Sequence, residues 1–249
     1  MADVLVIGSA VVDFVFATDE LPTAPTKYRA EHAEIVGGGC AANAAVAVSR
    51  LGGRAYLGAR LGDDQLGSLI IGDLEAEGVR TDLVQITPGG ASSFSSIYVD
   101  ASGERQIMNF RGSGLTDATA WIAGVPQIGA VLADTRWPAA AIAGLELASV
   151  RNVPGVLDAE APIDTQLLEH ASHVAFSRQG LLSVSTETDL EAALRDVSAR
   201  YPAWMCVTDG ENGTFFLDQG SICTVPAFKV QVKDTLGAGD VWHGAFTLA

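Results

Sequence analysis

Lysine is scarce in this chain. Only Lys27, Lys229 and Lys233 occur among its 249 residues, and none of them follows a glycine. The Gly-Lys pair of a Walker-A phosphate loop is therefore absent, so any nucleotide must be bound in another way. Cysteine is scarce too, and the three thiols are too widely spaced for a disulfide framework or a zinc site. We expect them to be reduced, which indicates a cytoplasmic protein.

Positive charge and long apolar runs are also lacking. The chain carries 15 Lys and Arg against 30 Asp and Glu, which gives a formal net charge of −15. Nucleic acids and anionic membranes bind a basic face, so we expect neither as a partner. The apolar run Val4–Val12 has no basic segment before it and is far shorter than the roughly 20 residues of a membrane-spanning helix.

Apolar residues nevertheless make up 48% of the chain, which is enough for one large domain with a sizeable core. Short uncharged runs that end in a polar residue predict buried parallel strands at Val4–Gly8, Ala130–Ala133, Gly155–Leu157, Val174–Phe176 and Met205–Val207. Helical spacing between them predicts helices at Cys40–Leu51, Gln65–Glu77, Pro138–Ser149, Ile163–His170 and Glu187–Arg200. This alternation predicts an α/β fold whose ligands bind beyond the carboxyl ends of the strands. Aspartates at those ends could carry chemistry or merely cap the next helix.

Two alternating segments, Ser93–Asp100 and Arg105–Arg111, surround a glycine-containing turn and predict a β-hairpin. Phe14–Ala17 and Ala30–Val36 could add further strands. We expect a small antiparallel sheet, formed by about residues 14–36 and 92–111, that serves as a lid on a single domain spanning residues 1–249. Its apolar residues Ile97, Val99 and Ile107 would need a cover, which predicts a homodimer through this sheet.

The segment 232–245, VKDTLGAGDVWHGA, is the sharpest motif. Gly237, Ala238 and Gly239 permit a tight turn into a helix that begins near Asp240, and the free N–H groups of a helix start bind anions. The carboxylate of Asp240 suits a general base for a hydroxyl that attacks a phosphoryl group. A dinucleotide-binding GxGxxG is disfavoured, since its third glycine would fall at Trp242.

A second glycine-rich segment, 37–52, reads GGGCAANAAVAVSRLG. Its glycines, Gly38 and Gly39 among them, would allow a ligand or another backbone to come close. Asn43, in the first turn of the helix that follows, could bind a polyol or could simply face solvent.

Together these segments resemble the two signatures of the PfkB (ribokinase-like) carbohydrate kinase family, and DTLGAGD at 234–240 matches most closely. The resemblance implies a ribokinase-like three-layer α/β domain with a central, mostly parallel sheet and a small antiparallel β-lid. It implies an ATP-dependent phosphotransferase that uses Mg²⁺, with K⁺ as a further candidate ion. Asp240 would be the catalytic base, and the amides of Gly237, Ala238 and Gly239 would bind the transferred phosphoryl group. Sugar-binding positions would be Asp13, Gly38, Gly39 and Asn43, and nucleotide-binding positions Thr208, Gly210, Gly213 and Thr235.

The chain departs from the family pattern in two places. Where relatives carry an Asn-Glu-x-x-Glu-like element that organises Mg²⁺, residues 176–180 read FSRQG and hold no carboxylate, so the metal ligands stay unassigned. The chain also ends nine residues after Asp240, whereas relatives continue for several helices that wall the adenine pocket and bear potassium-site groups. We therefore expect those C-terminal helices to be missing.

Several local stretches are most similar to 6-deoxy-6-sulfofructose kinase within this family. By that resemblance Lys27, Asn109 and Arg136 would hold a sulfonate, a permanent anion that suits a cation, an amide and a guanidinium fork. Each of the three could instead have an ordinary surface role, as a loop charge, a lid-edge residue and a salt bridge. Asn43 departs from that enzyme's motif and matches general sugar kinases. A ketodeoxygluconate, fructose, ribose or nucleoside kinase, or a catalytically dead sugar-binding relative, therefore remain alternatives.

Overall fold

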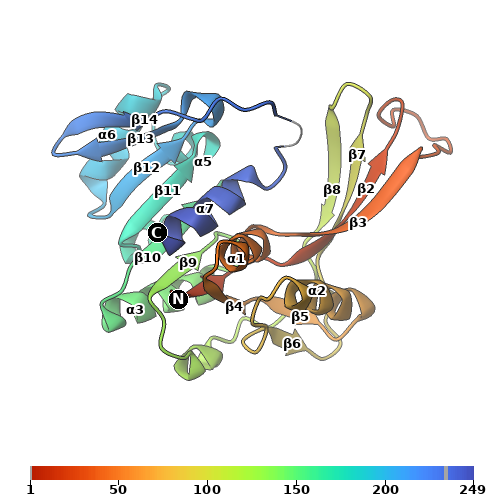
Figure 1. The fold of residues 1–249 in the computed structure, drawn as a ribbon, viewed down its shortest axis with the longest axis horizontal. Helices are drawn as coiled ribbons and strands as arrows, with labels where there is room; N and C mark the ends of the chain where they lie inside the picture. The colour runs from red at the N-terminus through yellow and green to blue at the C-terminus, as the bar shows by residue number, and fades with distance from the viewer. Residues whose placement is uncertain (1, 233–234) are drawn as a thin grey trace.

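A computed structural model describes residues 2–232 and 235–249. Its centre is an eight-stranded sheet with the order β14-β13-β12-β11-β10-β9-β1-β4 (Figure 1). The strands are β1 Asp3–Ile7, β4 Arg54–Gly58, β9 Ala130–Ala133, β10 Gly155–Ala159, β11 His173–Ser177, β12 Trp204–Thr208, β13 Thr214–Asp218 and β14 Ser221–Val225. All pairs from β4 to β12 are parallel, and β13 and β14 add antiparallel pairs. The predicted mostly parallel sheet is confirmed.

Strands β4, β13 and β14 were not predicted from the sequence. They lie at the two ends of the sheet, where part of each strand is exposed. Of the three, only β14 (SICTV) mixes polar and apolar types, whereas β4 and β13 hold the short uncharged runs Ala55–Gly58 and Phe215–Leu217, which were not recognised as strands.

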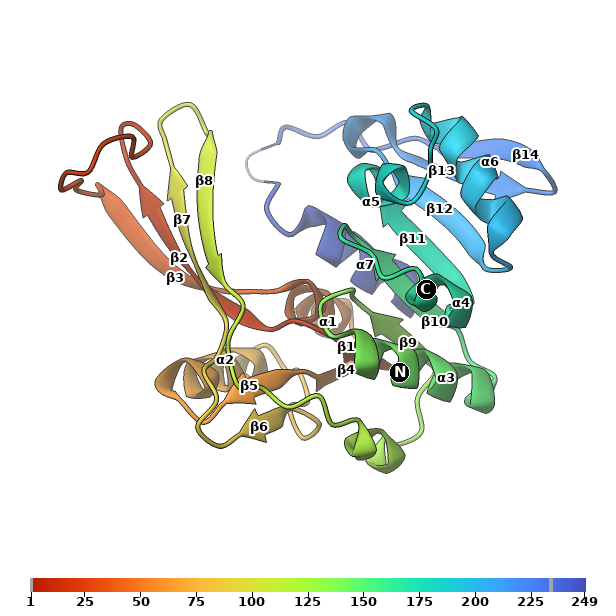
Figure 2. The ribbon, with the colours of Figure 1, turned by 180° about the vertical axis from the view of Figure 1, so that it is seen from behind.

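Helices cover both faces of this sheet. Val4 and Val6 of β1 belong to the core shared with α1, whereas Leu5 and Ile7 belong to the core shared with α3 and α6. Figure 2 shows α3 to α6 from behind, on the face opposite α1 and α7. The helices are α1 Cys40–Arg50, α2 Gln65–Ala76, α3 Pro138–Arg151, α4 Gln166–His170, α5 Arg178–Ser183, α6 Leu190–Arg200 and α7 Ala238–Leu248. The predicted three-layer arrangement is thus present.

Local capping decides where some helices begin. Helix α6 begins at Leu190 and not at the predicted Glu187, because the Asp189 side chain accepts a hydrogen bond from the Ala192 amide. Helix α5, which was not predicted, is capped by Ser177, whose hydroxyl accepts from the Gly180 amide. Such caps are short-range signals that apolar periodicity does not register.

A second, four-stranded sheet has the order β3-β2-β7-β8 and is here named the small sheet. Its strands are β2 Val11–Ala17, β3 His32–Gly38, β7 Phe94–Val99 and β8 Arg105–Phe110. The outer pairs are antiparallel, as expected, while the central pair β2/β7 is parallel. In Figure 1 the small sheet extends away from the large sheet, with α1 and α2 at its base. Its register aligns Val36, Asp13, Ser95 and Asn109 in one row. A further short pair joins β5 Arg60–Gly62 to β6 Gln85–Thr87.

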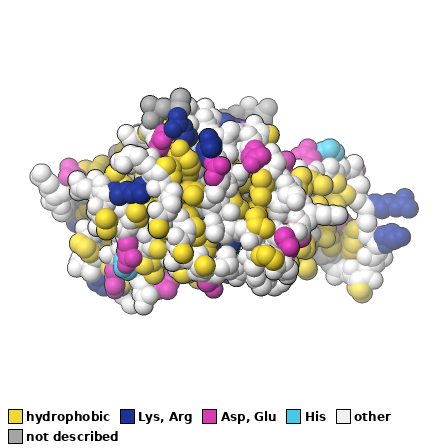
Figure 3. Space-filling model, turned by 90° about the horizontal axis from the view of Figure 1, so that it is seen from below, with side chains coloured by type: hydrophobic (Ala, Val, Ile, Leu, Met, Phe, Trp, Pro, Cys, Tyr) yellow, Lys and Arg dark blue, Asp and Glu magenta, His cyan; other side chains and the backbone are white. Residues whose placement is uncertain are grey.

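None of the helices in the described part of the chain is long and apolar enough to cross a membrane. On the face seen in Figure 3, Lys and Arg side chains occur as small separate groups among acidic and apolar ones. The scarcity of basic residues in the sequence is therefore visible on this face as well.

Candidate active site

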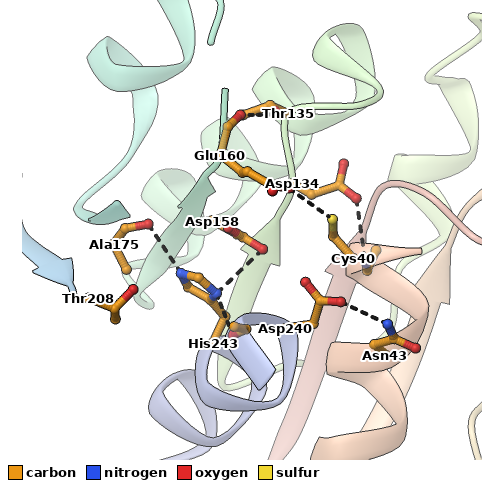
Figure 4. A network of polar contacts seen from close by, with 12 residues as sticks. Cys40, Asn43, Asp134, Thr135, Asp158, Glu160, Ala175, Thr208, Asp240 and His243 are labelled. Carbon is orange, nitrogen blue, oxygen red and sulfur yellow. Dashed lines mark hydrogen bonds and ion pairs between the residues drawn. The ribbon is translucent and has the colours of Figure 1, made fainter. Parts of the chain in front are cut away.

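Helices α1 and α7 pack against each other and bring the two glycine-rich segments together. A Cβ atom at Gly244 would lie 2.5 Å from the Ala44 carbonyl oxygen, so the helices can approach this closely only with glycine there. Asn43 of α1 donates a hydrogen bond from Nδ2 to Oδ2 of Asp240 in α7, at 2.8 Å (Figure 4). The catalytic and sugar-binding residues proposed from two distant motifs are therefore in direct contact.

The motif around Asp240 turns into α7 at Gly237, which has a φ of 71°. That left-handed conformation favours glycine, and a Cβ at this position would lie 3.1 Å from Asn43 Nδ2. The Ala238 amide donates to the Thr235 carbonyl oxygen at 3.2 Å, while the amides of Gly239 and Asp240 belong to the first turn of the helix. Thr235 is exposed, and Lys233 and Asp234 lie outside the described residues. This helix start offers N–H groups to an anion.

Asp240 shares its surroundings with several other carboxylates. Asp134 follows β9, Asp158 lies in β10 and Glu160 follows it, all at the carboxyl ends of the parallel strands (Figure 4). Asp158 is 5% exposed, and burial together with the negative charges of Asp240, Asp134 and Glu160 raises its pKa well above the usual range. Its Oδ2 lies 3.4 Å from Nδ1 of the buried His243. This end of the sheet therefore has an excess of negative charge.

Burial also raises the pKa of Asp240, and the hydrogen bond from Asn43 opposes that rise. A carboxylate whose pKa lies closer to neutral pH is a better proton acceptor from a hydroxyl than an ordinary aspartate. The thiol of Cys40 lies close to Asp240 and Asp158. Burial together with the nearby carboxylates raises the pKa of this thiol, so it stays protonated.

Asp134 has a structural task that the sequence left open. Its carboxylate accepts hydrogen bonds from the amide and hydroxyl of Ser9, both at 2.8 Å, and from the Ala41 amide at 3.3 Å. The Ser9 hydroxyl in turn accepts from the Cys40 amide at 3.0 Å. Gly39 has a φ of 95°, and a Cβ atom at this position would lie 2.6 Å from the Ser9 carbonyl oxygen, so the turn needs glycine here. Asp134 thus fixes the start of α1.

Asp13 approaches the same region from the small sheet. It is 9% exposed, and its Oδ1 has no hydrogen-bond partner among the described residues. Burial raises its pKa, and a hydrogen bond with Ser95 opposes the rise. A Cβ at Gly38 would lie 2.3 Å from Asp13 Oδ2, so glycine is needed beside this carboxylate. Asn109 donates to the Ser95 hydroxyl at 3.1 Å and so extends the same polar row.

A cleft of about 940 Å³ connects these groups. The site residues among its lining are Asp13, Gly38, Gly39, Asn43, Gly237 and Asp240. Buried carboxylates and an amide facing one cleft suit a small polyol, whose hydroxyl groups donate to the former and accept from the latter.

The three residues expected to hold an anionic substituent do not contact one another. Arg136 donates to Glu160 Oε2 at 2.8 Å and to the Ala161 carbonyl oxygen at 3.1 Å. Lys27 is exposed in the segment that joins β2 to β3, while Asn109 belongs to the row that begins at Asp13. The structure thus aligns Asn109 with Ser95 and Asp13 across the small sheet, and it pairs Arg136 with Glu160.

Three of the four expected nucleotide residues lie at the end of β12 and in the turn after it, whereas Thr235 precedes α7. Thr208 ends this strand and donates from Oγ1 to the Phe176 carbonyl oxygen of β11 at 3.3 Å. Gly213, with a φ of 91°, allows the end of β14 to pass so close that a Cβ would lie 2.2 Å from the Val225 carbonyl oxygen. Gly210 also has a positive φ. Thr208, Gly210 and Gly213 therefore form one tight turn next to the carboxyl end of β11.

The carboxylates around Asp240 can be tested for their fit to Mg²⁺. Oxygen atoms of Asp158 and Asp240 and the sulfur of Cys40 lie within 4.8 Å of one another. Carboxylate oxygens are the ligands that Mg²⁺ prefers, whereas a protonated thiol is not one. A divalent cation would also offset the negative charge that raises the pKa of Asp158. The carboxylates fit Mg²⁺, and sequence reasoning missed Asp158 because its strand-end position alone did not distinguish it from a cap.

The model of the family described as pfkB family carbohydrate kinase matches residues 1–249. The chain belongs to this family. It is therefore a carbohydrate kinase, a phosphotransferase with an alcohol group as acceptor.

Individual relatives of this pfkB kinase include a ribokinase from Bacillus subtilis, 28% identical over 100% of the chain and 86% of the relative. A fructokinase-2 from Solanum habrochaites is 29% identical over 96% of the chain and 78% of the relative. The crystal structure of a candidate ribokinase from Agrobacterium tumefaciens has a TM-score of 0.89 and 33% identity, over 99% of this chain and 83% of that one. A ribokinase from Arabidopsis thaliana, complexed with ribose and ATP, shares the fold with a TM-score of 0.84 at 23% identity, over 100% of this chain and 86% of that one. The particular similarity to 6-deoxy-6-sulfofructose kinase is not shown by these comparisons.

Proposed function

We propose that this pfkB kinase transfers the terminal phosphoryl group of ATP to a primary hydroxyl of a ketose, with Asp240 as the general base. The observation that carries the proposal is the position of Asp240 in a cleft that it shares with Asp13 and Asn43, at the start of α7. A base, hydroxyl-binding groups and an anion-binding helix start are the parts that phosphoryl transfer to a sugar requires.

In this mechanism Asp13 and Asn43 orient the sugar, and Asp13 Oδ1 accepts a hydrogen bond from one of its hydroxyl groups. Asp240 takes the proton of the reacting hydroxyl as the sugar oxygen bonds to the γ-phosphorus, and the bond from that phosphorus to the leaving ADP oxygen breaks. The N–H groups at the start of α7 stabilise the charge on the transferred group. Asp158 would hold Mg²⁺, which when bound neutralises charge on the phosphates.

Replacing the base tests this function. Asp240→Asn keeps the size and can still form a hydrogen bond with Asn43, but it cannot take a proton at neutral pH. We expect kcat to fall by at least about 100-fold, because general-base catalysis contributes about 10²–10⁴ in rate. Sugar binding, measured by calorimetry, should persist. Asp218→Asn, at an exposed aspartate at the end of β13, is the control and should leave kcat unchanged. Full activity in the Asp240 variant would refute the proposed base.

We propose a ketose as the substrate class and, more narrowly, a ketose that carries an anionic substituent. Asn109 supports the anionic substrate, since it lies in the polar row with Asp13 and Ser95. Lys27 and Arg136 would be the two cations. The relatives named as ribokinase and fructokinase favour a neutral ribose or fructose as the alternative. ADP release measured across sulfofructose, fructose, fructose 6-phosphate, ketodeoxygluconate and ribose decides among them.

The small sheet is proposed to act as a lid over the sugar and as the interface of a homodimer. Ile35, Ile107 and Met108 are 58%, 53% and 76% exposed on it. They lie on its two outer strands, β3 and β8, and exposed large apolar side chains favour an interaction surface. Ile97, by contrast, is buried within the protomer.

A further inference from the structure

Arg178 stands where the metal-organising carboxylates of relatives were expected, and its surroundings give it a defined position. Strands β11 and β12 are parallel neighbours, and Ser177 pairs with Thr208 in their register. Arg178 and Asp209, the residues that follow, therefore lie next to each other beyond the same edge of the sheet. Thr208 and Gly210, two expected nucleotide-binding residues, flank Asp209 in the sequence.

The guanidinium of Arg178 is held from one side. Its Nε donates to Asp209 Oδ1 at 2.7 Å and its Nη2 donates to Asp209 Oδ2 at 2.9 Å. Asn212 also donates to Asp209 Oδ2, at 2.9 Å, so the carboxylate is held by its own turn as well as by Arg178. The Asp209 side chain is 11% exposed, but that of Arg178 is 51% exposed. Nη1 forms no hydrogen bond to any residue that the structure describes, so the second edge of the guanidinium, formed by Nη1 and the remaining N–H of Nη2, is available to a ligand.

The excess of acids at this edge of the sheet means that an anionic ligand needs a cation beside it in order to bind. Asp134, Asp158, Glu160 and Asp240 gather here, and Arg136 is already paired with Glu160. The polyphosphate of a nucleotide would add further negative charge beside these acids, which like-charge repulsion opposes. A guanidinium matches two phosphate oxygens at once and stays charged at any physiological pH. Arg178 is thus a cation positioned at the expected nucleotide turn.

We propose that Arg178 binds the terminal phosphates of the nucleotide, with Asp209 as the residue that positions its guanidinium. The proposal rests on the proposed kinase function. It assigns to this chain an arginine contact at the place where relatives organise a metal ion with carboxylates. An exposed salt bridge without a ligand would contribute little to stability, so a purely structural pair is the alternative that the experiment must separate.

Calorimetric titration with ADP and with AMP tests the assignment without requiring turnover. The measured quantity is the preference of the protein for ADP, expressed as the ratio of the AMP and ADP dissociation constants. In Arg178→Gln we expect this ratio to fall about 10- to 100-fold, because a charge-assisted hydrogen bond to the terminal phosphate is lost. Arg178→Lys keeps the charge but not the fork and should lie between. The KM for the sugar should not change.

The matched control is Arg195→Gln. Arg195 lies in α6, the helix that follows the α5 helix of Arg178, but it donates to the Gly220 carbonyl oxygen in the β13–β14 turn, at the opposite end of the strands. Its ADP preference should equal that of the wild type. An unchanged ratio in Arg178→Gln, or an equal loss of ADP and AMP binding, would overturn the proposal. If the wild type binds neither ADP nor ATP, the proposed kinase function fails instead, and the two failures are distinct.

Discussion

At the scale of single residues, the proposed general-base chemistry depends on how burial and hydrogen bonding set the pKa of Asp240. Burial raises that pKa above the ordinary value of 3.8, and the hydrogen bond from Asn43 lowers it. The base acts only when it is deprotonated, so activity is present above the pKa of Asp240 and is lost as the pH falls through it. The acid limb of the kcat profile should therefore lie above that of an ordinary aspartate.

Removing the Asn43 donor should move this limb further up. In Asn43→Ala the burial of Asp240 is no longer opposed by that hydrogen bond, so the pKa rises and the limb shifts to higher pH. At the alkaline plateau we expect a loss of kcat of no more than about tenfold, the value of one hydrogen bond. Ser49→Ala in the same helix is the control, because the Ser49 hydroxyl has no partner among the described residues. A kcat–pH profile decides, and a limb that stays in place or moves to lower pH contradicts the assignment.

At the scale of the elements, the site exists because α1 and α7 touch. Asn43 and Asp240 are 197 positions apart in the sequence, and the close approach at Gly244 brings their helices together. A methyl group at this position would push the Ala44 backbone away. Both the packing of the two helices and the contact between the two site residues depend on this glycine.

Gly244→Ala should therefore lower both stability and activity. Forcing a methyl group into such a contact costs about 1–3 kcal/mol, which denaturant unfolding measures as a drop in the free energy of unfolding. Gly72→Ala in α2 is the matched control, since a Cβ there meets nothing within 4 Å. The control should be neutral or stabilising by up to about 1 kcal/mol, because alanine favours a helix interior over glycine. Equal effects of the two substitutions would show that the contact is unimportant.

At the scale of the whole molecule, the small sheet extends away from the large one (Figure 1). It carries exposed apolar side chains. We expect wild-type protein at micromolar concentration to have twice the protomer mass of 25.8 kDa in light scattering. The double variant I107D/M108D places a charge on each face of β8 and should yield monomers. Val150→Asp, at a residue of α3 that is 84% exposed, is the control and should leave the dimer intact. A monomeric wild type, or a double variant that stays dimeric, contradicts an interface through this sheet.

Much of the fold was predictable from the sequence. The central strands are buried on both faces, so each appears as an uncharged run, and β9 was predicted with the bounds that it has. The edge strand β14 could not be found in this way, because the polar residues Ser221 and Thr224 interrupt its apolar ones. Asp240 and Asn43 could be proposed as site residues, since a glycine-rich turn beside a carboxylate or an amide is a local pattern, and the structure brings the two side chains into contact.

The sequence by itself determined the α/β class, the two glycine-rich motifs and the family, because these are patterns within short segments. Only the tertiary structure decided which of the strand-end acids has which task. Asp134 anchors α1, Asp158 is buried beside Asp240, and Asp209 holds Arg178. In the sequence each of these acids follows a short, uncharged apolar run, so their local context is the same. They differ only in the neighbours that parallel strands and packed helices bring to them. Those neighbours come from distant parts of the chain, so no local pattern can encode them.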